Sequence, residues 1–336
     1  MLLRRSLLTA ATLLSAVACG GSQPPPEPAP APVAELPPAP VETSTAPAAA
    51  AAQPEAEKPP VPAASIPGLR YAEGLSTPES VLYDVEGDRY LVSNINGKPT
   101  DADNNGYISS LAPNGTVTKD KLIAAGVNNV KLDAPKGLGL WKGILYVADL
   151  TVVRKFDLKT GAARGEIKVA GATFLNDVAV GPDGKVYVSD SGMKAGAEGF
   201  EPTGTDAVYV IEKDKVRALA KSKELSGPNG LLVTDKGLLV TTFGSNELFR
   251  LDDQGVRQDI TKLPDGGLDG IVAVGDSLLV SSWKSSSVYR GKLGSDKFEV
   301  VLSGLKAPAD IGYDTKRSRV LVPRFMENAV EVYDVK

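Results

Sequence analysis

The sequence predicts an all-β domain, a six-bladed β-propeller, from three observations: a hairpin pattern that recurs, the spacing of its copies, and a strand at each end of the domain that lacks a partner. The pattern is clearest over residues 174–191, FLNDVAVGPDGKVYVSDS, where two segments with alternating valines flank a Gly-Pro-Asp-Gly turn. Alternation with a period of two is typical of strands, and proline followed by glycine is typical of a tight turn. The segment is therefore a predicted hairpin with polar residues at its open end.

The hairpin pattern occurs six times between residues 68 and 336. Each copy begins with a residue that we call the lead residue, at the start of the first strand. The lead residues are 57, 40, 53, 40 and 40 residues apart, and propeller blades are four-stranded sheets of about 40 to 45 residues. In chain order the lead residues are Glu79, Lys136, Asn176, Asn229, Asp269 and Ala309.

The residues between the hairpins leave room for two more strands per repeat, as at 107–112 and 117–124. The longer spacings hold insertions at 96–105 and 192–206, each after a second strand. The last repeat has only three strands, and a short segment at 69–74 precedes the first repeat. Because a closed ring has no exposed strand edges, we expect 69–74 to supply the outer strand of the last blade.

Residues 1–19 are predicted to be a secretion signal, with two arginines, a short apolar run, small residues and then Cys19, the only cysteine. The run is too short to span a bilayer, which needs about 20 apolar residues. The segment resembles a bacterial lipoprotein signal, so we expect a lipidated Cys19 that anchors the protein in the cell envelope, at the outer membrane. Ala16 stands where leucine is usual in such signals, so a soluble secreted form is the alternative.

Residues 20–67 hold 15 of the 25 prolines of the chain. A segment rich in proline and alanine buries too little apolar surface to offset its ordering entropy, which predicts a disordered linker. Residues 68–336 are then the propeller. We expect this domain to be monomeric.

The composition excludes several kinds of chemistry. The chain has no histidine, which removes Ser-His-Asp triads, Cys-His pairs and histidine metal ligands. The net charge of −4 and the lack of a basic patch argue against nucleic acid as a partner. Catalysis would have to use carboxylates, amides, hydroxyls, lysine, arginine or a hard metal ion.

Propeller symmetry places the lead residues around one mouth of the central channel, and four of them carry side-chain oxygens. A hard divalent cation binds several carboxylate and carbonyl oxygens at about 2.3 to 2.6 Å. The sequence therefore predicts one divalent cation, Ca²⁺ foremost with Mn²⁺, Zn²⁺ or Mg²⁺ as alternatives. Asn and Asp also favour turns before strands, but four such positions in register favour a site. The predicted ligands are Glu79, Asn176, Asn229 and Asp269.

Lys136 places an ammonium group in the same ring. It would repel a cation if it pointed inward. We expect it to bind the carboxylate of an acidic substrate, or to extend to solvent.

The second strands end at the same mouth and form a second ring of residues. Asp190 and Arg324 in this ring are predicted substrate contacts, and Arg324 could instead pair with Asp310. Trp283 is a further predicted substrate contact, which would stack on a ring of the substrate. The alternative, which is favoured, is that Trp283 packs between blades with Phe243 and Phe325. The second ring consists of Asn94, Asp149, Asp190, Thr242, Ser282 and Arg324.

Residues 101–106, DADNNG, match the start of a calcium-binding loop. The twelfth position of this loop is Ala112, where such loops need a bidentate glutamate, and predicted strands flank it. A plain hairpin loop is therefore favoured over a second, weak calcium site.

Four segments resemble the family of the senescence marker protein (regucalcin), gluconolactonase and the luciferin-regenerating enzyme: PES around Glu79, NDVAVGPDG around Asn176, PNGLLV around Asn229 and LDGIVAV around Asp269. The resemblance covers residues 69–336 with the segments in order. It implies a six-bladed propeller with one metal at the channel mouth. Glu79, Asn229 and Asp269 are the implied ligands, with Asn176 as ligand or substrate contact. In hydrolytic members the metal polarises a lactone carbonyl, which implies Asp269 as the catalytic residue that positions or deprotonates the water.

Two functions follow as expectations. The first is a metal-dependent hydrolase that opens a lactone or similar small-molecule ester. The second is a non-enzymatic surface propeller that binds a small ligand or a protein and uses metal only for rigidity, since a fold alone does not choose a function.

Overall fold

A computed structural model of the chain describes residues 65–197, 199–295 and 297–335. The predicted signal, Cys19 and the linker up to residue 64 lie outside the described residues. Ser65 already pairs with Ser303, through its backbone N–H at 3.0 Å and its Oγ at 3.1 Å, three residues before the predicted start of the domain. None of the described helices is long and apolar enough to cross a membrane.

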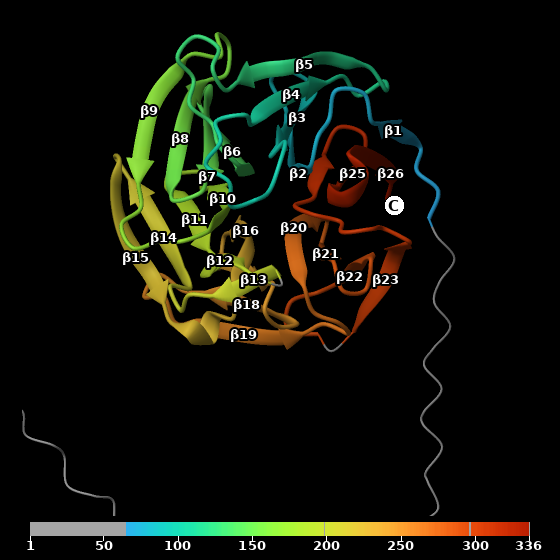
Figure 1. Cartoon of the computed structure of the whole chain (residues 1–336). Helices are drawn as coiled ribbons and strands as arrows, with labels where there is room; N and C mark the ends of the chain where they lie inside the picture. Colours follow the sequence, from blue (N-terminus) through green and yellow to red (C-terminus); the bar gives the residue numbers. More distant parts are fainter. Residues whose placement is uncertain (1–64, 198, 296, 336) are drawn as a thin grey trace, which may run out of the picture. The chain divides into compact units, whose positions relative to one another are not determined.

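Six four-stranded antiparallel sheets surround a central axis, as the sequence predicts (Figure 1). The first strands of neighbouring blades contact each other, so they line the centre of the ring. Blade 1 consists of β2 (Pro78–Asp84), β3 (Arg89–Asn94), β4 (Tyr107–Leu111) and β5 (Val117–Ala124). Blade 2 consists of β6 (Pro135–Trp141), β7 (Ile144–Asp149), β8 (Val152–Asp157) and β9 (Ala163–Lys168). Blade 3 consists of β10 (Leu175–Val180), β11 (Val186–Asp190), β14 (Ala207–Glu212) and β15 (Lys215–Lys221).

Blade 6 takes its outer strand from the other end of the domain, and two 3-10 helices, η1 (Lys223–Leu225) and η2 (Phe325–Glu327), lie between strands. Blade 4 consists of β16 (Pro228–Thr234), β17 (Gly237–Thr242), β18 (Glu247–Leu251) and β19 (Arg257–Lys262). Blade 5 consists of β20 (Leu268–Val274), β21 (Ser277–Ser282), β22 (Ser287–Gly291) and β23 (Phe298–Ser303). Blade 6 consists of β24 (Gly312–Asp314), β25 (Arg319–Arg324), β26 (Ala329–Asp334) and β1 (Leu69–Tyr71).

The hydrophobic core is divided among the junctions between blades. Each of six clusters of buried apolar side chains combines residues from two neighbouring blades. Between blades 2 and 3, for example, Val153 packs in the same cluster as Val178 and Tyr209. Every valine-rich hairpin therefore serves two cores, one on each face, which explains why both faces of its inner strands are buried.

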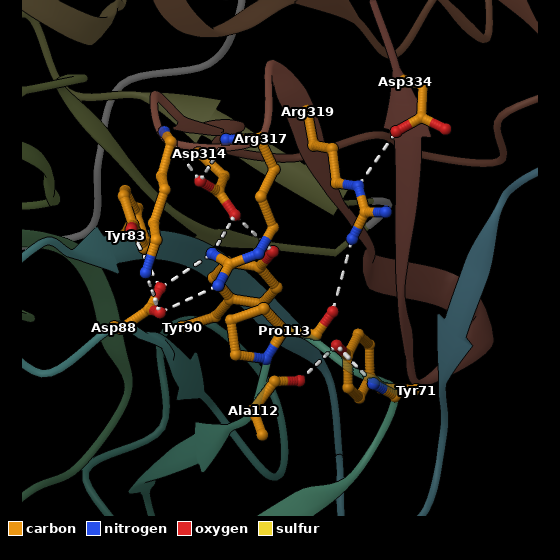
Figure 2. Close-up of polar contacts among 12 residues, drawn as sticks. Tyr71, Tyr83, Asp88, Tyr90, Ala112, Pro113, Asp314, Arg317, Arg319 and Asp334 are labelled. Carbon is orange, nitrogen blue, oxygen red and sulfur yellow. Dashed lines mark hydrogen bonds and ion pairs between the residues drawn. The ribbon is translucent and has the colours of Figure 1, made fainter.

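The ring closes where β1 pairs with β26, with Tyr71 opposite Val330. This confirms the prediction that the segment before the first repeat completes the last blade. A polar network on the turn side of the same junction joins blades 1 and 6 (Figure 2). Asp314, fully buried, accepts hydrogen bonds from the Tyr90 hydroxyl at 2.7 Å and from Arg317 at 3.0 Å. Arg317 also pairs with Asp88 and holds the pKa of that carboxyl well below its usual range.

Replacing Asp314 by alanine is expected to lower the free energy of unfolding by about 3 kcal/mol, because the buried Tyr90 hydroxyl and Arg317 lose their shared acceptor. Equilibrium unfolding in urea measures the change. Asp334→Ala is the matched control, since its pair with Arg319 is exposed and should contribute less than about 1 kcal/mol. Equal effects of the two substitutions would contradict the role given to this network.

The two insertions lie at the mouth, beside the ends of second strands. Residues 192–206 form a two-stranded hairpin of β12 (Met193–Gly196) and β13 (Gly199–Pro202), labelled in Figure 1. Residues 96–105 form a loop closed by hydrogen bonds of its own, from Asn96 to the Asn105 carbonyl at 3.1 Å and from Asn105 to Asp103 at 2.6 Å.

Candidate metal centre at the channel mouth

Five of the six lead residues lie at β-bulges, where the first strand of the blade changes register against the second. In blade 4, Pro228 is opposite Thr242 and Leu231 is opposite Val240, so Asn229 and Gly230 together face Thr241. Blades 1, 2, 3 and 5 have the same shift at the same place. A bulge changes the direction of a side chain at the end of a strand. Five lead residues thus share one backbone geometry.

Glycine follows the lead residue in blades 2, 4 and 5, and close packing requires it. A Cβ atom on Gly230 would lie 2.2 Å from the Asp269 carbonyl oxygen, and one on Gly270 would lie 2.3 Å from the Ile311 nitrogen. These glycines let the first strands of neighbouring blades approach each other at the mouth, and with them their lead residues.

Hydroxyl groups on the second strands hold the lead residues of the next blade in place. Ser189 donates to the Asn229 carbonyl at 2.7 Å, and Thr241 donates to the Asp269 carbonyl. Ser281 does the same for the Ala309 carbonyl at 2.8 Å. These positioning residues were not predicted from the sequence. In the sequence, each of them is a serine or threonine that directly precedes a residue of the second ring.

Three of the four predicted ligands carry a buried oxygen that has no hydrogen-bond partner. These atoms are Glu79 Oε2, Asn229 Oδ1 and Asp269 Oδ1. The residues are only 5 %, 1 % and 2 % exposed, respectively. A buried acceptor without a partner costs about 1 to 3 kcal/mol. Three of them, at equivalent bulges of blades 1, 4 and 5, therefore form a set of oxygens to which a cation or a donor could bind.

Burial, with a smaller effect of neighbouring carboxylates, raises the pKa of Glu79 and of Asp269. The pKa of Glu79 lies well above its ordinary value because of burial and the nearby Asp269 and Asp310 carboxylates. Burial raises the pKa of Asp269 to about 8, although hydrogen bonds from Trp283 and Asn229 act in the opposite direction. Burial therefore disfavours the charged forms of both carboxylates, and a divalent cation would favour them.

Asn176 differs from the other predicted ligands because its amide nitrogen is already used. Nδ2 donates to Ser191 Oγ at 3.0 Å, and that hydroxyl donates to the Pro228 carbonyl at 2.8 Å. This orientation leaves Oδ1 as the amide atom for a ligand. Within the described residues no three Asp, Glu, His or Cys side chains form a metal cluster, so the candidate set is two carboxylates and two amides. Such mixed oxygen sets suit Ca²⁺.

Trp283 connects the aromatic residues of the mouth with Asp269. Its Nε1 donates to Asp269 Oδ2 at 2.7 Å, which fixes the carboxylate with Oδ1 unpaired. Its ring lies between those of Phe243, 5.5 Å away, and Phe325, 5.0 Å away. The packing between blades that the sequence favoured for these aromatics is present, together with a bond to Asp269 that was not expected.

Lys136 is 1 % exposed, and its side chain does not extend to solvent. Its Nζ donates to the Ala134 carbonyl at 3.1 Å and lies 4.4 Å from the centroid of the Phe174 ring. Burial lowers the pKa of Lys136 to about 8, although the nearby Glu79 carboxylate opposes this. The ammonium is therefore held against an aromatic face beside Glu79.

Asp190 and Arg324, the other predicted substrate contacts, are occupied by internal bonds. Asp190 is fully buried and accepts the backbone N–H of Phe174 at 2.9 Å and of Gly192 at 3.1 Å. Arg324 pairs with Glu331 and, at 2.8 Å, with Glu327 rather than with Asp310. Both residues hold loops of the mouth in place, and Arg324 Nε is buried without a partner; their contact with a substrate stays a prediction.

Two further buried acids lie one residue beyond lead positions. Asp177 accepts the Leu231 N–H at 2.6 Å, and Asp310 accepts the Ser80 hydroxyl at 2.5 Å. Ser80, Asp177 and Asp310 help to line a cavity of ≈ 1120 Å³ formed by the first strands. The cavity includes the turns at the far ends of these strands, so the channel is hollow on the side away from the lead residues.

The comparisons with known proteins concern the fold. No protein-family model and no curated protein matches the chain. A gluconolactonase from Xanthomonas campestris superposes with a TM-score of 0.59 at 18 % identity, over 78 % of this chain and 86 % of that one. The likeness shows a shared fold.

Two other solved structures are similar to the chain. A catalytically inactive virginiamycin B lyase from Staphylococcus aureus, solved with quinupristin, has a TM-score of 0.54 at 14 % identity, over 80 % of this chain and 98 % of that one. A chain of the nidogen/laminin complex has a TM-score of 0.54 at 17 % identity, over 67 % of this chain and 80 % of that one. A lactonase and a lyase thus share this fold, and a fold alone does not choose a function.

Replacing Thr241 by valine is expected to weaken Ca²⁺ binding about 10-fold, because the Asp269 backbone loses the hydroxyl that positions it. Titration calorimetry measures the affinity. Thr234→Val is the matched control in the same blade, since Thr234 bonds the Gly237 carbonyl at the opposite end of the hairpin. Unchanged affinity in Thr241→Val, or an equal loss in both variants, would contradict this role.

Proposed function

We propose that the protein is a metal-dependent hydrolase that opens a lactone or a similar ester at the mouth of the propeller. The observation that carries the proposal is the set of unpaired, buried oxygens on Glu79, Asn229 and Asp269. A protein that kept these acceptors without a ligand would lose stability at each of them. The shared fold with a gluconolactonase supports the choice of reaction.

Glu79, Asn229 and Asp269 would hold the cation, with the Asn176 amide as a further ligand. Oxygen ligands of mixed charge make Ca²⁺ the first choice, with Mn²⁺, Zn²⁺ and Mg²⁺ as alternatives. When bound, a divalent cation polarises a substrate carbonyl and lowers the pKa of a nearby water.

Asp269 is the residue proposed to act on the water. Its Oδ1 is the unpaired atom that would face the cation, and its Oδ2, which accepts the Trp283 Nε1–H at 2.7 Å, would accept the proton of the water. The water oxygen bonds to the acyl carbon, the ring C–O bond breaks, and the former ring oxygen takes up a proton. The product is a hydroxy acid, and no other reactant is needed.

The test combines metal analysis of the purified protein with turnover of a panel of lactones, before and after treatment with a chelator. We expect about one equivalent of divalent cation, loss of turnover on chelation and recovery on adding Ca²⁺. Asn229→Ala should lose the bound metal. A protein that binds metal but hydrolyses no lactone would support the non-enzymatic alternative, and one that binds no metal would overturn the proposal.

We also propose that Cys19 anchors the enzyme to the cell envelope, as the lipoprotein-like signal indicates. Expression with labelled palmitate should label the wild-type protein and leave Cys19→Ser unlabelled. Label in both proteins, or in neither, would contradict a lipid anchor at this residue.

A further inference from the structure

Aromatic side chains form one side of the mouth, beside the candidate catalytic residue. Phe243, Trp283 and Phe325 follow the second strands of blades 4, 5 and 6, and their rings are in contact. We call these three residues the aromatic wall. The bond from Trp283 to Asp269 places the wall next to the carboxylate that would act on the water. Any substrate carbonyl near Asp269 therefore has this wall beside it.

A second apolar surface belongs to blade 3. Phe200 on β13 contacts Phe174, with ring centroids 5.5 Å apart, and Phe174 in turn covers the Lys136 ammonium. Phe200 is 48 % exposed, and Met326, next to the aromatic wall, is 68 % exposed. Together with the aromatic wall, these side chains are the apolar groups that a ligand at the mouth would meet.

Three charged side chains that the sequence placed at the mouth make internal contacts in the structure. Arg324 is paired with Glu327 and Glu331, and Asp190 accepts backbone N–H groups. Lys136 is buried under Phe174. A substrate hydroxyl placed against aromatic rings would lose its bonds to water without gaining new ones, which is unfavourable.

We propose that the mouth selects lactones or esters that carry an apolar alkyl or aryl group, and discriminates against polyhydroxylated sugar lactones. The lactone ring lies at Glu79, Asn229 and Asp269, and the apolar group lies against the aromatic wall and Phe200. This inference rests on the proposed hydrolase function, and it names the substrate class for the same site.

The test compares δ-lactones that differ only in their substituents: δ-decalactone with a pentyl tail, unsubstituted δ-valerolactone, and glucono-δ-lactone. We expect kcat/KM for δ-decalactone to exceed the values for both others by at least about 10-fold, since an apolar group in an apolar site contributes about that factor or more. The corresponding lactams, which are hydrolysed far more slowly, are titrated in parallel to measure affinity without turnover.

Two substitutions locate the preference. Phe200→Ala and Phe325→Ala are each expected to reduce the ratio of affinities for the tailed and bare lactams by about 5-fold or more. Val256→Ala is the matched control, because Val256 is also exposed but lies in the β18–β19 turn, at the opposite end of blade 4. It should leave the ratio unchanged.

The outcomes separate this inference from the function on which it rests. If the tailed lactam binds more tightly than the bare one and Phe200→Ala reduces this difference, the inference is supported, even if no lactone is hydrolysed. The absence of lactone hydrolysis would overturn only the proposed hydrolase function. Equal affinity for all lactams, no binding, or preference for the gluconic compounds would overturn the inference, and lactone turnover could still support the hydrolase.

Discussion

Replacing Asp269 by asparagine is expected to lower kcat/KM for lactone hydrolysis on the order of 10³-fold, as loss of a general base does in other enzymes. Asparagine keeps the size of the side chain and an oxygen that can accept the Trp283 N–H. It cannot take a proton from water, and it removes one of two negative charges from the cation site. The measurement is a steady-state assay at saturating Ca²⁺, so that weaker metal binding does not account for the loss.

Asp84→Asn is the matched control for this prediction. Asp84 is also buried and lies at the opposite end of its strand, paired with Arg89 at 2.8 Å. We expect its kcat/KM to stay within about 2-fold of the wild type, because it contacts neither substrate nor cation. An Asp269→Asn enzyme that remains fully active would disprove the role of this carboxylate in the reaction.

Trp283→Phe separates positioning from packing at the same site. Phenylalanine retains a ring between Phe243 and Phe325 but donates no hydrogen bond to Asp269. Loss of this bond should lower kcat about 10-fold and move the acidic limb of the pH–rate profile upward, since the bond favours the charged carboxylate. A purely structural role would leave the pH profile in place.

The second large effect concerns stability in the absence of metal. The pKa of Asp269 is raised to about 8 by burial, against an unfolded value near 3.9. Between these values the folded protein binds more protons than the unfolded chain. The contribution of this group to stability is therefore present below about pH 4 and lost as the pH rises toward 8. Glu79, whose pKa is also raised, acts in the same direction.

Bound Ca²⁺ should offset this loss, because it favours the charged carboxylates. We expect a chelated sample to become less stable between pH 5 and 8, over the range set by these pKa values. At pH 8, Ca²⁺ at about 100 times its Kd should stabilise the fold by about 2.7 kcal/mol, a rise in Tm of about 5 to 10 °C. At pH 5 the same Ca²⁺ concentration should have a smaller effect.

Differential scanning calorimetry with Ca²⁺ or with chelator, at both pH values, measures these shifts. Asn229→Ala is an informative variant because it removes a neutral ligand. It should lose the response to Ca²⁺ and keep the decline in stability with pH. Equal Tm values with Ca²⁺ and with chelator at pH 8 would show that no cation binds at the mouth.

Most of the fold was predictable because its signals are local. A strand with alternating valines, such as Val178 and Val180, followed by a Gly-Pro-Asp-Gly turn is recognisable from neighbouring residues alone. The spacing of six such hairpins then predicted the number of blades. Closure by β1 also followed, since a ring with one three-stranded blade needs an outer strand. The structure confirms these points.

The side-chain contacts at the mouth were only partly predictable from local sequence patterns. The register of the hairpins predicted which lead residues share one end of the channel. It did not predict that Lys136 would turn onto Phe174 of blade 3, or that Arg324 would pair with Glu331 on β26. Each of these contacts depends on another segment of the chain, and no pattern around the residue itself records it.

By itself, then, the sequence determined six hairpins, their closure into a ring and the ring of Glu79, Asn176, Asn229 and Asp269. These follow from strand periodicity, turn residues and spacing, which are properties of short segments. The tertiary structure alone decided which oxygens of that ring stay unpaired and that Trp283 holds Asp269. The physical reason is that the hydrogen-bond partners of these polar atoms come from neighbouring blades. Those partners reach the atoms only when the ring has closed.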